Sequence, residues 1–315
     1  MEDSAFDPAV LAWLQQGDVA IAFQARRDLL GQSDPALRAR IATEGWGALL
    51  LAARHADGVW GQRFYQPKWT SSHYTLLDLR TLEVHPAHPP IRASIAKILA
   101  EEKKPDGGIG PGRSIPVSDV CVNGMFLNYA AYFGSPEDGL RSVVDFILAQ
   151  QMEDGGFNCN NNTVGATHSS LHSSLSVAEG IETYAASGYS YRVAALRRAA
   201  AEARDFMLRH RLFRSQRTGA IISPQFLRLS FPPRWKFNIL RALDHFRAAR
   251  HPWDDRLADA MQVLVSRRGK DGRWRLAAAH PGQVHFVMEQ AGQPSRWNTL
   301  LALRVMRAYA GTIAA

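Results

Sequence analysis

The feature that most constrains this chain is a glycine-containing turn that recurs along its length. Five such turns are present, and their first residues lie about 50 apart except for one longer interval between the third and the fourth. They are Asp57-Gly58-Val59-Trp60-Gly61, Asp106-Gly107-Gly108-Ile109, Asp154-Gly155-Gly156-Phe157, Thr218-Gly219-Ala220-Ile221 and Asp271-Gly272-Arg273-Trp274. A repeat of this length is one supersecondary unit that cannot bury its apolar face alone, so neighbouring units must pack against one another.

Two kinds of predicted helix flank each turn. The segment before a turn is amphipathic, which is typical of an outer helix, whereas the segment after it is apolar over most of its circumference and is predicted to lie inside. The predicted inner helices span residues 70–83, 119–134, 168–187, 234–249 and 296–310. An N-terminal pair at residues 8–15 and 18–31 brings the number of helix pairs to about six.

These patterns predict an all-α fold in which the helix pairs close into a ring. We expect an α/α toroid (an α/α6 barrel) of about six helix pairs, formed by residues 1–315 as a single domain. The longest connections lead into the inner helices, so they gather at one end of the ring, where a site would be built. They span residues 58–69, 105–118, 155–167 and 272–294.

Composition excludes several classes of partner. The net charge is +8, but the basic residues are scattered, so we expect a solvated surface and no nucleic-acid partner. No apolar stretch approaches the roughly 20 residues that a membrane-spanning helix needs. Cys121 and Cys159 are the only cysteines, which implies no disulfide framework, and the N-terminus does not resemble a signal peptide. A cytoplasmic location is therefore expected, and the oligomeric state is left open.

One group of candidate residues lies at the starts of two successive inner helices. Asp119 and Cys121 open one helix, and His168 and His172, four residues apart, open the next. A carboxylate, a thiolate and an imidazole suit Zn²⁺ with one open coordination position. The alternative is structural: Asp119 caps its helix, Cys121 packs as a small hydrophobe, and the histidines bond to backbone carbonyls. Cys159, in the intervening loop, is a candidate additional ligand.

A second group combines basic and aromatic side chains near the starts of inner helices. Arg234 and Arg296 could neutralise an anionic head group. Aromatic rings could line an apolar cavity and stabilise a developing carbocation, or simply form core, and the candidates are Tyr74, Trp235 and Trp297. His73 resembles His172 in repeat position and is a candidate acid or base.

The repeat resembles that of the prenyltransferase and squalene-cyclase superfamily over nearly the whole chain. Turns such as Gln150-Gln151-Met152-Glu153-Asp154-Gly155-Gly156-Phe157 look like the superfamily's repeat. Arg113, followed after five residues by Asp119-Val120-Cys121, looks like the zinc and diphosphate segment of protein prenyltransferase β-subunits. This resemblance implies that Asp119, Cys121 and His172 bind zinc and that Arg113 contacts a diphosphate.

The chain also departs from the patterns of this superfamily. Pro116 stands where a lysine is usual in the prenyltransferases, and Val122 stands where a tyrosine is usual, which puts diphosphate binding in doubt. The squalene-cyclase branch uses an Asp-x-Asp-Asp motif as its acid. Here Asp119 is the only carboxylate of the corresponding segment, so protonation-initiated polycyclisation is not expected.

The leading hypothesis is a zinc-dependent, prenyltransferase-like enzyme that holds an isoprenoid or similarly apolar substrate in the toroid's central cavity. Asp119, Cys121 and His172 would bind Zn²⁺ while the arginines neutralise an anionic head. One alternative is a metal-free terpenoid cyclase or isomerase in which Asp119 is the acid and His73 or His172 the base. The other is a non-catalytic toroid that binds a lipid or a protein.

Overall fold

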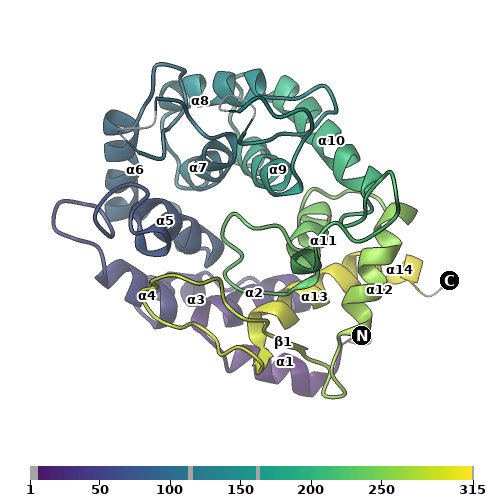
Figure 1. Ribbon diagram of the computed structural model, residues 1–315. Coiled ribbons are helices and arrows are strands. Elements are labelled where there is room, and N and C mark those ends of the chain that lie inside the picture. The colour runs from purple at the N-terminus through teal and green to yellow at the C-terminus, as the bar shows by residue number, and fades with distance from the viewer. Residues whose placement is uncertain (1–5, 113–115, 161–163, 314–315) are drawn as a thin grey trace.

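The computed structural model describes residues 6–112, 116–160 and 164–313, and in this part of the chain the helices form two concentric layers (Figure 1). The inner layer consists of α2 (Val19–Leu30), α5 (Ser72–Thr81), α7 (Val120–Tyr132), α9 (Leu171–Ala186), α11 (Ile239–Ala248) and α13 (Arg296–Ala308). The outer layer consists of α1 (Pro8–Gln15), α3 (Pro35–Arg40), α4 (Gly45–Ala52), α6 (Pro89–Glu101), α8 (Glu137–Ala149), α10 (Val193–Arg209) and α12 (Ala258–Ser266). The predicted all-α toroid is confirmed.

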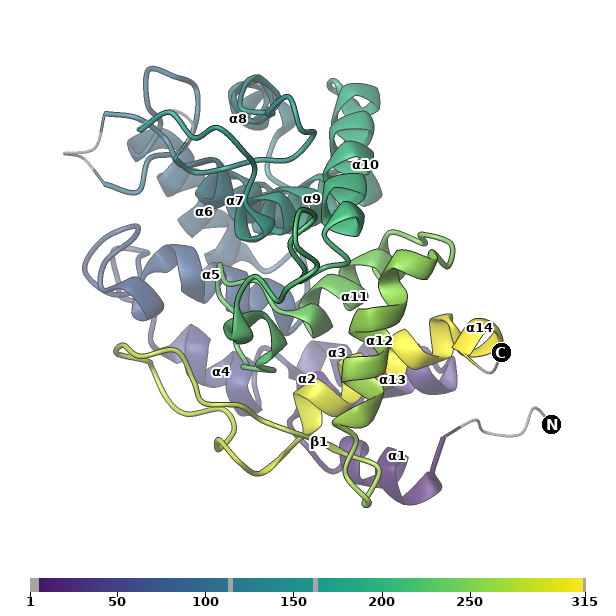
Figure 2. The same ribbon diagram turned by 45° about the vertical axis from the view of Figure 1, so that its right-hand side comes forward.

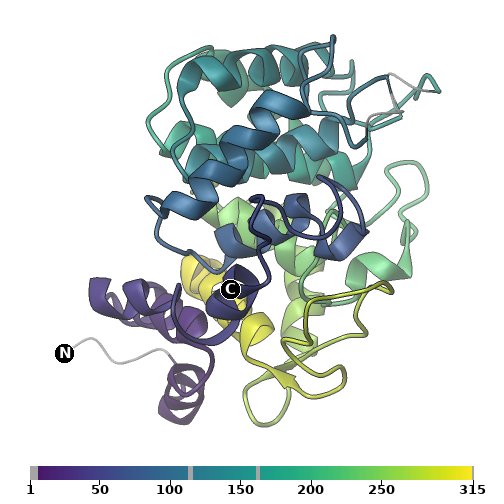
Figure 3. The same ribbon diagram turned by 90° about the vertical axis from the view of Figure 1, so that its left-hand side faces the viewer.

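Minor elements complete the described part of the chain. Short 3₁₀ helices η1 (Lys68–Thr70), η2 (Pro224–Leu227) and η3 (Asp255–Leu257) lie in connections, and α14 (Ala310–Ile313) follows α13. Strands β1 (Trp274–Arg275) and β2 (Pro294–Ser295) pair antiparallel and hold together the two ends of the long connection before α13. The long connections project from one side of the ring, as the view of its edge in Figure 3 shows. No described helix has the length and apolar character that a membrane crossing requires.

The glycine turns are joined to the inner helices by an equivalent hydrogen bond in four of the five repeats. In each, the backbone N–H of the large apolar residue after the turn donates to a polar side chain near the start of the following inner helix. The pairs are Trp60 to Ser72 at 2.9 Å, Ile109 to Asn123 at 2.7 Å, Phe157 to Ser174 at 3.0 Å and Trp274 to Thr299 at 3.1 Å. Asn123, Ser174 and Thr299 each lie four residues after the N-cap of their helix, whereas Ser72 directly follows the N-cap Ser71.

The N-terminal helix α2 closes the ring against the C-terminal helix α13. A buried hydrogen bond joins them, because Arg304 donates to the Gln24 side chain at 2.7 Å, and Arg304 also forms an ion pair with Asp28. Figure 2 shows α2 and α13 side by side from a second direction. Helix α2 is therefore part of the toroid rather than an appendage to it.

The inner helices α7 and α9 approach each other closely at two glycines. A Cβ atom on Gly180 would lie 2.1 Å from the Gly124 carbonyl oxygen, and one on Gly124 would lie 2.6 Å from the Val177 Cα. Any side chain at either position would force the helices apart. The two helices carry Asp119 and His172 at their N-terminal ends, so this contact fixes how those two residues lie relative to each other.

Two predicted helix starts were wrong. The helix predicted from residue 234 begins at Ile239, because Arg234 has a left-handed backbone (φ 58°) and Asn238 caps the helix by accepting the Arg241 N–H at 2.9 Å. The helix predicted from residue 168 begins at Leu171. His168 therefore lies in the preceding loop, exposed to solvent, and does not share a helix face with His172.

Candidate functional site

A group of side chains that we call the mouth lies at the N-terminal ends of α5, α7 and α9. It consists of Tyr65, Lys68, Trp69, Asp119, His172 and Trp235. Lys68 lies in η1, three residues before Ser71, which is the N-cap residue of α5, whereas Asp119 is itself the N-cap residue of α7. Because α5 and α7 are neighbours in the inner layer, the Lys68 ammonium acts electrostatically on the Asp119 carboxylate.

Aromatic faces surround the Lys68 ammonium. Its Nζ lies 5.1 Å from the Trp69 ring centroid, 5.3 Å from that of Trp235 and 5.8 Å from that of Tyr65. Ring faces carry negative electrostatic potential and attract a cation at such distances. The mouth therefore already holds one positive charge between three rings, as a site that stabilises a carbocation would.

Asp119 is the carboxylate of the mouth. Its side chain caps no backbone N–H of α7 and has no hydrogen-bond partner among the described residues. Burial raises the pKa of the Asp119 carboxyl, and the positive charge of Lys68 opposes this rise without cancelling it. The predicted role as a simple helix cap is thus not what the carboxylate does, and the group is available for proton transfer.

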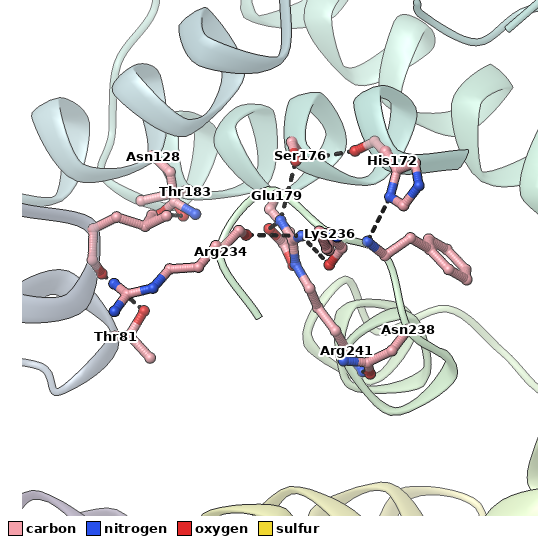
Figure 4. Close-up of polar contacts among 12 residues, drawn as sticks. Thr81, Asn128, His172, Ser176, Glu179, Thr183, Arg234, Lys236, Asn238 and Arg241 are labelled. Atoms are coloured by element: carbon pink, nitrogen blue, oxygen red, sulfur yellow. Dashed lines mark hydrogen bonds and ion pairs between the residues drawn. The ribbon is translucent and has the colours of Figure 1, made fainter. Parts of the chain in front are cut away.

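His172 is neutral and already engaged through one nitrogen. Its Nδ1 accepts the Phe237 backbone N–H at 2.7 Å (Figure 4), and its ring packs 4.9 Å from that of Trp235. Burial, with the nearby charges of Arg241 and Lys236, lowers the pKa of His172 to about 4. Since Nδ1 accepts a hydrogen bond, the proton of the neutral ring lies on Nε2, where it can donate but cannot act as a base.

His73 lies behind the aromatic wall rather than in the mouth. Its ring is fully buried against Phe64, Tyr74 and Tyr129, and its Nδ1 is 3.3 Å from the Tyr129 hydroxyl. Burial lowers the pKa of His73 to about 3. The two histidines occupy equivalent positions as predicted, because each is the second residue of its inner helix, after the N-caps Ser71 and Ser170.

Residues 230–238, which we call the strap, cross the ring below the mouth and are held there by two buried ion pairs. Arg234 pairs with Asp78 on α5. Arg241 forms a bidentate pair with Glu179 on α9, at 2.9 and 2.6 Å, and donates to the backbone carbonyls of Arg234 and Lys236 at 3.2 and 3.0 Å (Figure 4). The strap lies between α11 and the fourth turn, which lacks the hydrogen bond found in the others.

A cavity of about 330 Å³ lies below the strap, towards the C-terminal ends of the inner helices. Its wall is strongly polar. Six arginines line it, Arg27, Arg80, Arg234, Arg241, Arg247 and Arg304, together with five carboxylates, Asp78, Glu83, Glu179, Glu182 and Asp244. This wall differs from the apolar cavity that the sequence predicts, because charged residues occupy the inner faces of helices whose remaining faces are buried.

The predicted zinc ligands do not fit a zinc ion as they are arranged. Cys121 is joined to Cys159 in a disulfide, which corrects the expectation that these cysteines stay unpaired and removes the thiolate that zinc would need. His172 has one nitrogen occupied by the Phe237 N–H. No group of three or more His, Cys, Asp or Glu side chains in the described ranges is placed to hold a metal. Zinc binding stays a prediction, and it requires Cys121 to be reduced.

The remaining predicted residues are dispersed. Arg113 lies outside the described residues. The Arg296 side chain points away from the ring axis to α1, where its guanidinium lies 4.6 Å from the Trp13 ring and its Nε donates to the Trp13 carbonyl at 3.0 Å. Trp297 lines the cavity and stacks on Phe231, 4.4 Å between ring centroids. Tyr74 supports the mouth by hydrogen bonding Tyr65 at 3.0 Å.

Two sets of residues, one in the mouth and one in the cavity wall, were not predicted from the sequence. Tyr65 and Lys68 lie in the connection before the predicted helix, and no motif in that connection singled them out. Arg80, Arg241 and His245 lie inside predicted inner helices, where ionisable side chains are rarely buried without a specific partner. Their presence in such helices was the available signal for a polar cavity.

Comparison with known proteins gives a limited result. No family model matches the chain, and no curated protein matches it. Among solved structures, it is similar to type II terpene cyclase MstE from Scytonema in the apo state, with 14% identity, a TM-score of 0.36 and coverage of 87% of this chain and 97% of that one. Variants of that enzyme in complex with merosterolic acid A, its product, and with geranylgeranyl dihydroxybenzoate, its substrate, match with the same identity and TM-score, and each match covers 96% of the variant's chain.

Proposed function

We propose that the protein is a metal-independent enzyme that transfers a proton to an isoprenoid or similar alkene at the mouth, with Asp119 as the acid. The observation that carries this proposal is the Asp119 carboxyl itself. It is partly buried, it has no hydrogen-bond partner among the described residues, burial raises its pKa, and it interacts with Lys68, whose ammonium lies among three aromatic rings. A carboxyl with a raised pKa stays protonated to higher pH and can serve as a general acid.

The reaction that suits a single carboxyl is an isomerisation. Protonated Asp119 gives its proton to one alkene carbon, and the carboxylate left behind stabilises the positive charge that forms on the adjacent carbon. The Asp119 carboxylate then removes a proton from a neighbouring carbon, which shifts the double bond and restores the acid. No second base is needed, which agrees with the buried position of His73 and the occupied Nδ1 of His172.

Conversion assays with matched variants test this proposal. Linear prenyl alcohols and prenyl acids are incubated with the enzyme in the presence of a metal chelator, and products are identified by mass spectrometry and NMR. Asp119→Asn should lower the rate by about 10²-fold or more, as expected for loss of a general acid. The control is Asp138→Asn, which removes an exposed carboxylate on α8 and should change nothing. Equal rates for Asp119→Asn and wild type would overturn the proposal, as would a rate abolished by the chelator.

A non-catalytic binding toroid is the second candidate, and the polar cavity favours it. Among the carboxylates that line the cavity, each one has an arginine within ion-pair distance. Because each of these carboxylates is engaged by an arginine, the cavity wall offers no unpaired acid for chemistry. If the mouth proves inactive in the conversion assays, ligand binding in the cavity becomes the leading function.

A further inference from the structure

The cavity below the strap is chemically distinct from the mouth. It lies on the other side of two buried ion pairs, Arg234 with Asp78 and Arg241 with Glu179. Its volume of about 330 Å³ is at the lower end of the range for ligand pockets. A water molecule takes about 30 Å³ of liquid, so the cavity has room for roughly ten waters or for one small metabolite. Apolar prenyl chains are a poor match for its charged wall.

One of the six arginines in the cavity wall has no carboxylate partner among the described residues. The other five pair with Glu83, Asp78, Glu179, Asp244 and Asp28. The Arg80 guanidinium instead donates to the Asn128 side chain at 2.9 Å and to the Thr183 hydroxyl at 3.3 Å, and its flat face lies 4.6 Å from the Tyr132 ring. Arg80 therefore carries a positive charge that no described carboxylate neutralises.

Two further nitrogens of the wall are buried without partners. His245 is 4% exposed and Arg304 is 6% exposed, and both line the cavity. The His245 Nε2 and the Arg304 Nε have no hydrogen-bond partner among the described residues. Burial lowers the pKa of His245 to about 3, so its ring is neutral and offers one donor and one acceptor. Buried polar atoms are normally satisfied, and those left open beside a cavity indicate a partner that comes from outside the chain.

Neutral hydrogen-bonding groups occupy the wall beside Arg80. Asn128 and Thr183 lie together in Figure 4, with Thr81 nearby on α5. The Thr183 hydroxyl bonds to Asn128 at 2.9 Å, and Gln24 donates to the Thr81 carbonyl at 3.1 Å. Hydroxyl and amide groups of this kind exchange hydrogen bonds readily with the hydroxyl groups of a ligand.

We infer that the cavity binds a small polyhydroxylated molecule with one anionic group, which Arg80 and Arg304 contact while His245 bonds to a hydroxyl. The anionic group is a phosphate or a carboxylate, because guanidinium groups recognise both. This site goes beyond the proposed function, since it needs neither Asp119 nor a prenyl substrate. The strap separates the two sites, so both can be occupied in one molecule.

Isothermal titration calorimetry at fixed ionic strength tests this inference. The probes are a hexose 6-phosphate, the corresponding hexonate and the uncharged hexose. We expect at least one anionic probe to bind the wild type, and the uncharged hexose to bind at least tenfold more weakly. The hexose 6-phosphate and the hexonate distinguish a phosphate from a carboxylate ligand. Failure of both anionic probes to bind at millimolar concentration overturns the inference.

Variants of the wall decide whether binding occurs in this cavity. Arg80→Gln should weaken binding at least tenfold, whereas Arg197→Gln, which removes the same charge from the exposed face of α10, should not. His245→Phe serves as the second variant, because Nε2 of the histidine has no partner to lose and the fold should remain intact. It should also weaken binding at least tenfold. Wild-type affinity in a folded Arg80→Gln or in His245→Phe overturns the inference.

Asp119→Asn separates this inference from the proposed function. The variant should bind the anionic probe with wild-type affinity, because Asp119 does not line the cavity. If Asp119→Asn binds normally and no prenyl substrate is converted by wild type, only the proposed function fails. If prenyl conversion occurs and no anionic probe binds, only the cavity inference fails. Loss of anion binding in a folded Asp119→Asn variant would contradict the separation of the two sites.

Discussion

The mouth and the cavity are built from opposite ends of the same inner helices, yet their chemistry is different. At the N-terminal ends, one half-buried carboxyl interacts with the Lys68 ammonium, which three aromatic rings surround. Towards the C-terminal ends, arginines and carboxylates pair with one another around about 330 Å³ of space. The mouth leaves the Asp119 carboxyl without a hydrogen-bond partner among the described residues, and the cavity leaves Arg80 without a carboxylate partner among them.

The difference follows from how each region is connected. The mouth is formed by the connections that precede α5, α7 and α9, where turn residues and helix caps set the geometry. The cavity is formed by side chains inside regular helices, which must satisfy one another because water does not reach them freely. The strap divides the two regions, and it lies between the fourth turn and the start of α11.

A substitution that releases the strap should cause the largest loss of stability. Arg241→Met leaves the Glu179 carboxylate buried without its partner and frees the backbone of residues 234–236, so we expect a loss of about 3–5 kcal/mol in the free energy of unfolding. Urea denaturation measures it. The control Arg141→Met breaks an exposed pair on α8 and should cost less than about 1 kcal/mol. If Arg241→Met is as stable as the control, the strap is not held as described and the two regions are not separate.

The contact between α7 and α9, which border both regions, gives the next largest expected loss of stability. Gly180→Ala places a methyl group 2.1 Å from the Gly124 carbonyl oxygen, and we expect a loss of about 1–3 kcal/mol as α7 and α9 move apart. Gly139→Ala, on the outer helix α8, meets only Leu99 at 3.3 Å and should be neutral or stabilising by up to about 1 kcal/mol. Similar thermal unfolding of the two variants would show that the close contact is absent.

The smallest expected effect is a shift in the pH dependence of the conversion rate. Protonated Asp119 is the active form, so the conversion rate should fall as pH rises through its raised pKa. The charge of Lys68 lowers that pKa, and Lys68→Met removes the charge. The midpoint of the falling limb should therefore move to higher pH in Lys68→Met. Lys270→Met, a change elsewhere on the surface, is the control. A midpoint that stays fixed or moves to lower pH would mean that Lys68 and Asp119 do not interact.

The toroid could be predicted from the sequence because its determinants are local and repeated. The spacing of the glycine turns and the apolar inner segments gave the boundaries of α5, α7 and α13 to within two residues at each end. The start of α11 was missed because Pro233 and the left-handed Arg234 interrupt the apolar pattern before the Asn238 cap. That interruption is the strap, whose path depends on partners far away in sequence.

The site was harder to predict because its contacts are long-range. Asp119 and His172 were named as a pair, but the pairing of Cys121 with Cys159 and the Phe237 N–H on His172 depend on how the loops fold back. Arg234 was expected to meet a ligand and instead meets Asp78, 156 residues earlier. Position in the repeat predicts which end of the ring a residue occupies, and it does not predict the partner that the residue finds there.

Deuterium transfer tests most directly whether Asp119 is an acid at the mouth. Wild type and Asp119→Asn are incubated with prenyl alcohols and prenyl acids in D₂O with a metal chelator, and carbon-bound deuterium is measured by NMR. We expect wild type to place deuterium on a substrate carbon and Asp119→Asn to place none above background. No carbon-bound deuterium with wild type, or equal incorporation by Asp119→Asn, would contradict the account.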